Sequence, residues 1–336
     1  MKMRRTVTLA ASLLVITLGV SACAPSEPPA DDGNITLVAI AGTSVDFISL
    51  VPLAAWDILK DEGITVEQRF VEDGATAIQA MQQGEAVIGT NIGVNTGVPA
   101  VDAGANIVDV VATQRPTWAL AVSPDIDDFS DLQDKRIGVH GETSFTRAVA
   151  QYYAQQHDFT YNELIIPGSD VRAEALAQGQ IDASVIDLPD VVQLEKTYPG
   201  SFKVLSTFGE QFPDLIEQDI WLSREWAEAN PELAVKIVKA VVEANRRLTD
   251  DVDYAYELAV ANLPDMDEGV LRDLVEEYSE RTIWSTDGGL TPERALITLT
   301  FFRDVGEIDI SVPTKDTIDK YFDFSYLEKA LAELDG

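Results

Sequence analysis

Polar residues follow the predicted strands at the places where a sheet usually presents a ligand. Gly42, Thr43 and Ser44 come directly after an apolar strand at residues 35–40, and Thr90 and Asn91 end another strand. In sheets built from strand–helix–strand units, ligands bind beyond the carboxyl ends of the strands. The glycine permits close approach to the backbone, and the hydroxyl and amide groups supply hydrogen bonds. These residues either bind a small molecule or form ordinary turns and helix caps.

A second polar segment, Gly141-Glu142-Thr143-Ser144, precedes a predicted helix at residues 145–156. Free backbone N–H groups and the positive end of the helix dipole favour an anionic group such as a sulfonate or carboxylate. Glu142 opposes that picture, because its charge repels an anion. It would instead accept hydrogen bonds from an amine or a pyrimidine. The alternative is a helix cap with Glu142 turned to solvent.

Further candidates lie near the predicted connections between two halves of the chain. Arg115 has the forked guanidinium that grips a carboxylate or sulfonate, or else it forms an ion pair between the halves. Trp118 and Trp221 either stack on a flat ligand or pack in the core. Asp187 and Asp190 either bind an ammonium or ring nitrogen or cap a helix.

Catalytic and metal-binding motifs are missing from the sequence. There are two histidines, His140 and His157, and one cysteine. Neither a Gly-x-Ser-x-Gly nucleophile turn, nor a phosphate-binding loop, nor a His-Glu-x-x-His pair occurs. We therefore expect no enzymatic activity, no metal site and no cofactor.

The N-terminus is typical of an export signal. Residues 1–5 are basic, residues 9–20 are almost purely apolar, and small residues follow up to Cys23. The run Val20-Ser21-Ala22-Cys23 resembles the bacterial lipobox, in which the cysteine is acylated and becomes the first residue. We expect residues 1–23 to be a lipoprotein signal peptide and the proline-rich residues 24–34 to be a flexible tether. The alternative is a plain signal peptide with an incidental cysteine.

The charge of the chain restricts its partners. Asp and Glu outnumber Lys and Arg by 57 to 24, which gives a formal net charge of −33. Such a surface repels nucleic acid and anionic lipid headgroups, so we expect neither as a partner. The acidity either keeps an exported protein soluble or steers a cationic ligand.

The elements that position these residues alternate between strand and helix. In the first half we expect strands at residues 35–40, 64–70, 86–90 and 107–112, with helices at 49–61 and 75–83. A similar order restarts with strands at 136–140, 164–166 and 181–186 and helices at 145–156 and 171–178. This alternation predicts right-handed crossovers and mainly parallel sheets.

The restart predicts two α/β lobes. The unit around Gly84, a helix followed by glycine and strand, resembles the unit around Gly179, although short units of this kind also resemble each other by chance. Helices dominate from residue 231 to the end, and we expect them to pack on the first lobe. The predicted division is residues 35–117 and 222–336 in a discontinuous lobe 1, and residues 118–221 in lobe 2.

These features together resemble a known family. Ser130-Asp131-Leu132-Gln133-Asp134-Lys135-Arg136-Ile137-Gly138-Val139 is similar to the entry into the second lobe of type II periplasmic-binding proteins. The resemblance covers about residues 35–324 and lies with the nitrate/sulfonate/taurine and thiamine-pyrimidine group that serves ABC importers. Asp134 departs from that group, which commonly has glycine there.

The resemblance implies a function. It implies a fold of two α/β lobes joined by a two-stranded hinge, a small-molecule ligand between the lobes, and delivery to an ABC permease. We expect an exported monomer, anchored by lipid to the outer face of the cytoplasmic membrane. The ligand is either sulfonate- or taurine-like or pyrimidine-like. The alternatives are a lipoprotein that feeds a membrane receptor, and an enzyme similar to the fungal pyrimidine synthases, which the single cysteine argues against.

Overall fold

The computed structural model describes residues 35–42, 45–71 and 73–336. The predictions for the signal peptide, Cys23 and the tether concern residues 1–34 and lie outside the described residues. The same holds for Thr43 and Ser44.

The first sheet has the strand order β2-β1-β3-β10-β4. β1 pairs in parallel with β2 and β3, whereas β10 is antiparallel to both β3 and β4. Four strands therefore run one way and β10 runs the other. The bounds are β1 Ile35–Ala41, β2 Ile64–Phe70, β3 Ile88–Thr90, β4 Ile107–Gln114 and β10 Gln218–Ser223.

The second sheet repeats this plan with the order β7-β6-β8-β5-β9. β6 is parallel to β7 and β8, and β5 is antiparallel to β8 and β9. Each sheet thus holds one reversed strand, and the prediction of mainly parallel sheets is confirmed. The bounds are β5 Ala119–Val122, β6 Arg136–Val139, β7 Asn162–Ile165, β8 Ala183–Ile186 and β9 Lys203–Thr207.

Helices cover both faces of the first sheet because its strands are apolar on both sides. Leu37 and Ala39 face one core with α1 and α9, while Ile40 and Trp221 face another with α2. Residues with opposite parity on one strand point to opposite faces, which explains the two cores. The bounds are α1 Leu50–Asp61, preceded by a 3-10 turn η1 at Phe47–Ser49, α2 Gly74–Gln82, α3 Val94–Asp102 and α9 Pro231–Asp250.

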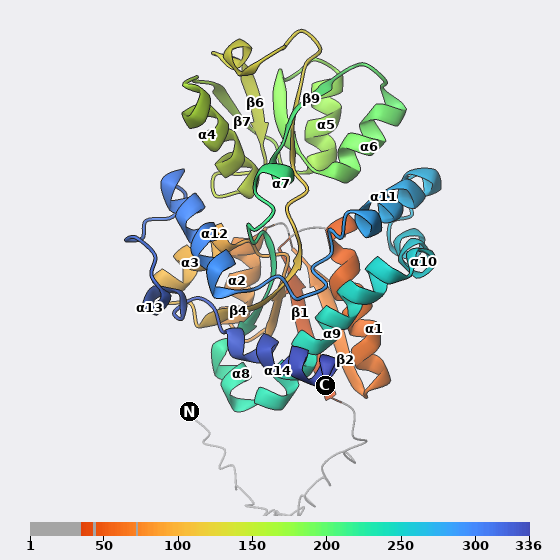
Figure 1. The fold of residues 1–336 in the computed structure, drawn as a ribbon, viewed down its shortest axis with the longest axis vertical. Coiled ribbons are helices and arrows are strands. Elements are labelled where there is room, and N and C mark those ends of the chain that lie inside the picture. Colours follow the sequence, from red (N-terminus) through yellow and green to blue (C-terminus); the bar gives the residue numbers. More distant parts are fainter. Residues whose placement is uncertain (1–34, 43–44, 72) are drawn as a thin grey trace, which may run out of the picture. The chain divides into compact units, whose positions relative to one another are not determined.

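The second sheet also lies between helices, with α4 on one side and α5 and α6 on the other (Figure 1). A 3-10 turn, η2 at Phe129–Leu132, leads into β6, and α7 follows β9. The helix bounds are α4 Phe145–His157, α5 Ser169–Ala177, α6 Leu188–Thr197 and α7 Phe208–Gln211.

The C-terminal third is helical, as the sequence predicts, and returns to the first sheet. α14 packs on α9 and β4, and residue Phe322 forms a bridge to Asp109 of β4. No helix in the described part of the chain is long and apolar enough to cross a membrane. The bounds are α8 Arg224–Ala229, α10 Val252–Asn262, α11 Glu268–Glu280, α12 Pro292–Asp304, α13 Lys315–Ile318 and α14 Phe324–Asp335.

Candidate functional site

Buried polar side chains gather where the strand ends of the first sheet meet those of the second. We call this set the seam. It combines the loop after β3 and the start of α3, the ends of β4 and β10 with the two segments that cross between the sheets, one loop of the second sheet, and the end of α11 with its following residues. Its members are Asn91, Asn95, Gln114, Thr117, Trp118, Asp187, Glu217, Gln218, Tyr278 and Trp284, all buried except Trp118, which is partly buried.

Asp187 joins the second sheet to the first crossover. It follows β8, caps α6 by accepting from the backbone N–H of Leu188 at 2.8 Å, and accepts a hydrogen bond from the hydroxyl of Thr117. Burial raises the pKa of Asp187, although these hydrogen bonds lower it. The predicted helix-capping role is therefore present, and the same carboxyl also faces the seam.

A fully buried arginine lies behind Asp187. The guanidinium of Arg172 donates to the carbonyl oxygens of Ile166, Gly168 and Val185 at 3.1, 2.9 and 3.2 Å. Burial lowers the pKa of Arg172 to about 10, and it raises the pKa of nearby Asp190 to about 7. Arg172 thus ties the ends of β7 and β8 together through their backbones.

Glu217 joins the two crossovers. One carboxylate oxygen, Oε1, accepts from the indole N–H of Trp118 and from Nε2 of Gln218, the latter at 2.8 Å. The other oxygen, Oε2, is buried and has no hydrogen-bond partner among the described residues. Burial, followed by the charge of Asp187, raises the pKa of Glu217 to about 8. At neutral pH this carboxyl is therefore mainly protonated.

Three aromatic rings form one wall of the seam. Tyr278 lies edge-on to Phe47, with ring centroids 4.7 Å apart, and 5.2 Å from Trp284. The Tyr278 hydroxyl is close enough to Thr117, Asp187 and Glu217 for those groups to affect its pKa, which burial raises well above the usual value. This wall therefore borders the carboxyl groups.

The loops after β1 and β3 lie against each other. A Cβ on Gly42 would come within 2.7 Å of Gly74 Cα and 3.0 Å of the Asn91 carbonyl, so only glycine fits this approach. Asn91 has a left-handed backbone with φ of 54°, and its amide donates to Ser49 at 3.5 Å. Thr90 is fully buried within β3. The structure thus places Gly42 and Asn91 together, while Thr90 packs beneath them.

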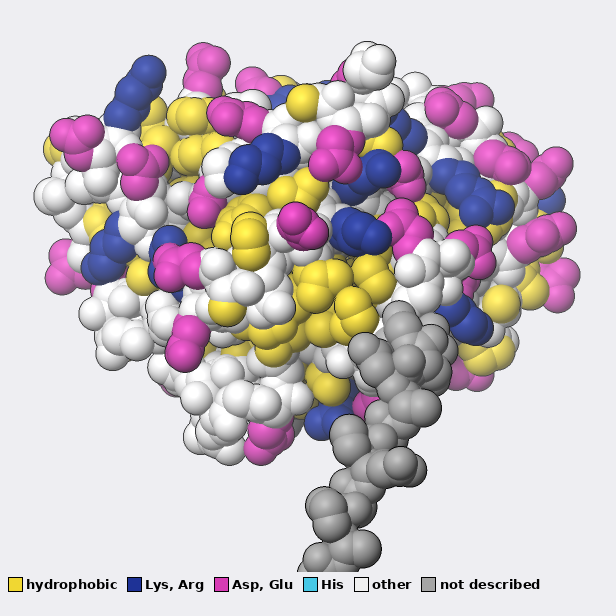
Figure 2. All heavy atoms as spheres, turned by 90° about the horizontal axis from the view of Figure 1, so that it is seen from below, with side chains coloured by type: hydrophobic (Ala, Val, Ile, Leu, Met, Phe, Trp, Pro, Cys, Tyr) yellow, Lys and Arg dark blue, Asp and Glu magenta, His cyan; other side chains and the backbone are white. Residues whose placement is uncertain are grey.

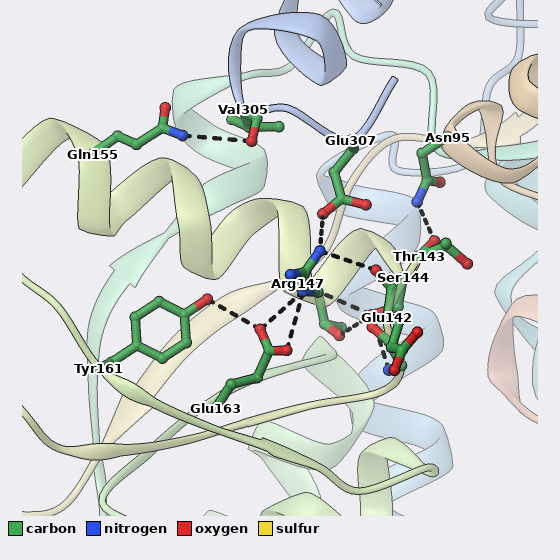
Figure 3. A network of polar contacts seen from close by, with 12 residues as sticks. Asn95, Glu142, Thr143, Ser144, Arg147, Gln155, Tyr161, Glu163, Val305 and Glu307 are labelled. Carbon is green, nitrogen blue, oxygen red and sulfur yellow. Dashed lines mark hydrogen bonds and ion pairs between the residues drawn. The ribbon is translucent and has the colours of Figure 1, made fainter. Parts of the chain in front are cut away.

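The loop at residues 141–144 contacts the first half of the chain through its backbone. The side-chain amide of Asn95 donates to the carbonyl of Thr143 at 2.5 Å (Figure 3). Ser144 caps α4 by accepting from the N–H of Arg147 at 3.3 Å, and the Glu142 side chain is exposed. This matches the capping alternative for Ser144. The ligand roles of Glu142, Thr143 and Ser144 stay predictions.

An ion-pair network lies beside this loop. Arg147 donates to Glu163 of β7 at 2.9 Å and to Glu307, which follows α12, at 3.0 Å (Figure 3). Nearby, the Gln155 amide donates to the carbonyl of Val305 at 3.4 Å. Arg147 therefore links the second sheet to the C-terminal helices.

Two predicted residues occupy different surroundings. The Trp221 ring is fully buried on β10, where its N–H donates to the Ile92 carbonyl at 2.8 Å and its ring packs against Gly97. Trp221 therefore packs in the core. The Arg115 side chain is partly buried and forms no ion pair with another described residue, so an anion-binding role stays a prediction.

Several seam residues were not singled out from the sequence. These are Asn95 on α3, Gln114 at the end of β4, Glu217 directly before β10 and Gln218 at its start, Tyr278 on α11, and Trp284 after α11. Glu217-Gln218 carried the best available signal, because two adjacent polar residues precede an apolar strand at a predicted crossover.

The described surface outside the seam has two hollows and no cluster of possible metal ligands. Two hollows of about 560 and 370 Å³ are lined by residues of α6, β9 and α11 and by residues around α14, none of them in the seam. On the face seen in Figure 2, acidic and basic side chains are interspersed around an apolar centre. No group of three or more possible metal ligands occurs within residues 35–42, 45–71 and 73–336.

Comparison with solved structures gives the fold. The nitrate-binding protein NrtA of Synechocystis PCC 6803 matches with a TM-score of 0.73 and 12% identity, over 90% of this chain and 89% of that one. The ligand-binding component of an ABC-type import system from Staphylococcus aureus matches with a TM-score of 0.71 and 13% identity, over 88% of this chain and 98% of that one. The aliphatic sulphonate binding protein SsuA of Escherichia coli matches with a TM-score of 0.65 and 17% identity, over 86% of this chain and 91% of that one. The predicted periplasmic-binding fold is confirmed.

Family membership rests on the sequence itself. No curated protein matches the chain. The family model described as NMT1/THI5 like matches residues 58–253, which is more than half of the 336 residues and includes the first crossover, Asp187, Glu217 and Gln218. The chain therefore belongs to the NMT1/THI5-like family, with the fold of the periplasmic binding proteins.

Proposed function

We propose that this protein is the extracytoplasmic solute-binding component of an ABC importer, which binds a small organic molecule at the seam and delivers it to a permease. The observation that carries the proposal is the position of the seam. Its polar groups come from both sheets and both crossovers, so a ligand there would contact every part that a hinge moves. Family membership and the fold support the same function.

We propose the lobe boundaries that the sequence predicts, residues 35–117 with 222–336 and residues 118–221. Asn91, Trp118 and Asp187 are the predicted site residues that lie in the seam, and we propose them as ligand contacts. Gly42, Thr90, Thr143, Ser144, Arg115 and Glu142 border it through loops and crossover residues.

Binding without catalysis fits the seam chemistry. Asp187 and Glu217 are engaged as hydrogen-bond acceptors, and no histidine or cysteine side chain is among the seam residues. A receptor-feeding role would use the same binding site and differ only in the membrane partner.

A thermal-shift screen of residues 24–336 tests the binding function. The panel contains taurine, alkanesulfonates, nitrate, aminopyrimidines and small amines. A ligand at 100 times its Kd stabilises the folded state by about 2.7 kcal/mol, which gives a clear rise in Tm. Asn91→Ala should reduce the rise, and Asn262→Ala on α10, whose amide bonds only within its helix, should not. A panel without any stabilising compound would contradict the function.

We propose that the protein is exported and lipid-anchored at Cys23, as Val20-Ser21-Ala22-Cys23 predicts. Cys23→Ala should leave the precursor uncleaved at that position and without acyl chains, since the thiol is the acceptor. Mass spectrometry of membrane and soluble fractions measures both. Normal cleavage and membrane retention in the variant would overturn the anchor while leaving ligand binding in place.

A further inference from the structure

Buried polar atoms of the seam lack hydrogen-bond partners among the described residues, and they include acceptor oxygens, the donors Gln114 Nε2 and Trp284 Nε1, and the Tyr278 hydroxyl. Glu217 is 1% exposed, and its Oε2 atom has no partner among the described residues. The side-chain oxygens of Gln114 and Gln218 are also buried and without a described partner. Buried polar groups are normally satisfied, so an unpartnered set at one place marks a position for a ligand group. The oxygens among these atoms require a ligand that donates.

These acceptors belong to one place. Gln114 and Gln218 are register partners at the ends of β4 and β10, and Glu217 adjoins Gln218. Gln114 also forms an isolated bridge with Trp284, whose buried indole N–H has no described partner. The set therefore joins the carboxyl of Glu217 directly to the aromatic wall.

Within the described residues, the acids at this place lack an ion-pair partner. Neither Glu217 nor Asp187 forms an ion pair with any lysine or arginine in the described part of the chain. Arg172, the buried cation behind Asp187, donates to three backbone carbonyls and not to a carboxylate. Burial raises the pKa of both acids, and a positive ligand would stabilise their ionised forms whereas an anionic one would not, so the pair favours a cation.

The aromatic wall favours the same class of ligand. The faces of Phe47, Tyr278 and Trp284 are fully or almost fully buried beside the acids. Aromatic faces attract organic cations, more strongly where water is excluded. Phe47 and Trp284 stack on each other with their planes 14° apart, so a cation would contact a ring face and the carboxylate together only when the seam opens.

We propose that the seam binds a small organic cation, an amine or an amidine-like nitrogen group, with Glu217 as its principal acceptor and Tyr278 and Trp284 as its aromatic wall. This inference rests on the proposed solute-binding function and specifies its substrate class. It predicts that the sulfonate-like and nitrate-like members of the panel do not bind.

Ligand charge should be coupled to the protonation of Glu217. Without ligand its pKa is about 8, and the groups that face it are Asp187, Asp219 and Tyr278. A bound cation stabilises the carboxylate and lowers that pKa, so binding at pH 7 releases a proton. Affinity for a permanently charged cation should therefore rise as the pH increases from 6 to 9.

Titration calorimetry of residues 24–336 tests this with ring-matched probes. Benzamidine and benzylamine carry the cation, benzyl alcohol is neutral, and benzenesulfonate and benzoate carry the anion. We expect binding of the cations alone, with affinity for benzamidine about tenfold higher at pH 8.5 than at pH 6.5. Heats measured in buffers of different ionisation enthalpy should show proton release near pH 7.

Glu217→Gln keeps the shape and the Trp118 hydrogen bond but removes the charge. It should weaken benzamidine binding at least about tenfold and abolish both the pH dependence and the proton release. Glu210→Gln makes the same change at an exposed position in the same crossover region. It should leave the benzamidine affinity, the pH dependence and the proton release unchanged. Melting curves without ligand establish that both variants are folded.

Each part of the proposal has a result that would overturn it. Binding of benzenesulfonate in preference to benzamidine would refute it and leave the solute-binding function standing. Cation binding that Glu217→Gln leaves unchanged would refute the assigned acceptor. If no compound of either charge binds and the wider screen is also negative, the solute-binding function fails together with it.

Discussion

At the scale of single residues, a pair of buried acids within the first sheet works against stability at neutral pH. Asp109 on β4 and Asp219 on β10 are both fully buried, and the Asp219 oxygens have no described hydrogen-bond partner. Burial raises the pKa of each well above its usual value, and the charge of Asp109 raises that of Asp219 further. The two carboxyls are therefore protonated under conditions in which an exposed aspartate is ionised.

The sign of the pH dependence follows from this shift. A carboxyl whose pKa is raised in the folded state contributes most to stability below its unfolded pKa of about 4, and that contribution is lost as the pH rises through the folded pKa. Asp219→Asn removes one such group. We expect the variant to increase the free energy of unfolding at pH 8 by on the order of 1–3 kcal/mol, and by less at pH 5. Urea unfolding at both pH values measures the difference.

Asp265→Asn serves as the matched control, because Asp265 is exposed and its substitution removes the same charge from the surface. It should change stability by no more than about 0.5 kcal/mol at either pH. Equal effects of Asp219→Asn at pH 5 and pH 8 would show that Asp219 has an ordinary pKa.

At the scale of elements, the sequence predicts the strands that alternate with helices and misses those that lie next to a crossover. β1, β2 and β4 and helices such as α1 and α9 carry clear apolar periodicity, and they appear close to the predicted bounds. β5, β9 and β10 were not expected as strands. Their short apolar runs become strands because neighbouring strands pair with them, which is a tertiary effect.

Helix α3 shows another limit of local reasoning. Val94–Asp102 contains Gly97 and Pro99, both of which disfavour a helix interior. A Cβ at Gly97 would lie 2.3 Å from the ring of Trp221, so glycine there permits the close contact between α3 and β10. Packing thus outweighs helix propensity, and the same contact explains why Trp221 belongs to the core.

The candidate site was predictable to the extent that it follows strand ends. Asn91 and Asp187 satisfy that rule, because each comes directly after a parallel strand. Tyr278 and Trp284 do not, since they come from the C-terminal helical region and reach the seam only when that region returns to the first sheet. Only the tertiary fold reveals such residues.

At the scale of the whole molecule, polar and aromatic contacts join the two halves beside the seam. Asn95 bonds to the Thr143 carbonyl, Arg147 pairs with Glu307, and Thr117 bonds to Asp187. The rings of Phe145 and Tyr152 on α4 also pack against Phe302 and Phe301 on α12, so a hinge that separates the strand ends must break these contacts. The ligand must then stabilise the closed form by its additional contacts.

Spin labels placed on α4 and α12 test this closure. Gln156 and Asp304 are exposed positions beside the contact between Gln155 and Val305, and the only native cysteine, Cys23, is absent from residues 24–336. In Gln156→Cys/Asp304→Cys protein we expect pulsed EPR to give two distances, one short and one long. Ligand should increase the fraction of molecules that show the short distance. Asn95→Ala should increase the fraction of molecules that show the long distance, because it removes the hydrogen bond from Asn95 to the Thr143 carbonyl across the seam. A pair at Asp125→Cys and Gln156→Cys, both around the second sheet, should give one distance throughout. A single α4–α12 distance that neither ligand nor Asn95→Ala changes would mean that the two halves form a rigid body, and ligand entry would then require a local opening of the loops instead of a hinge.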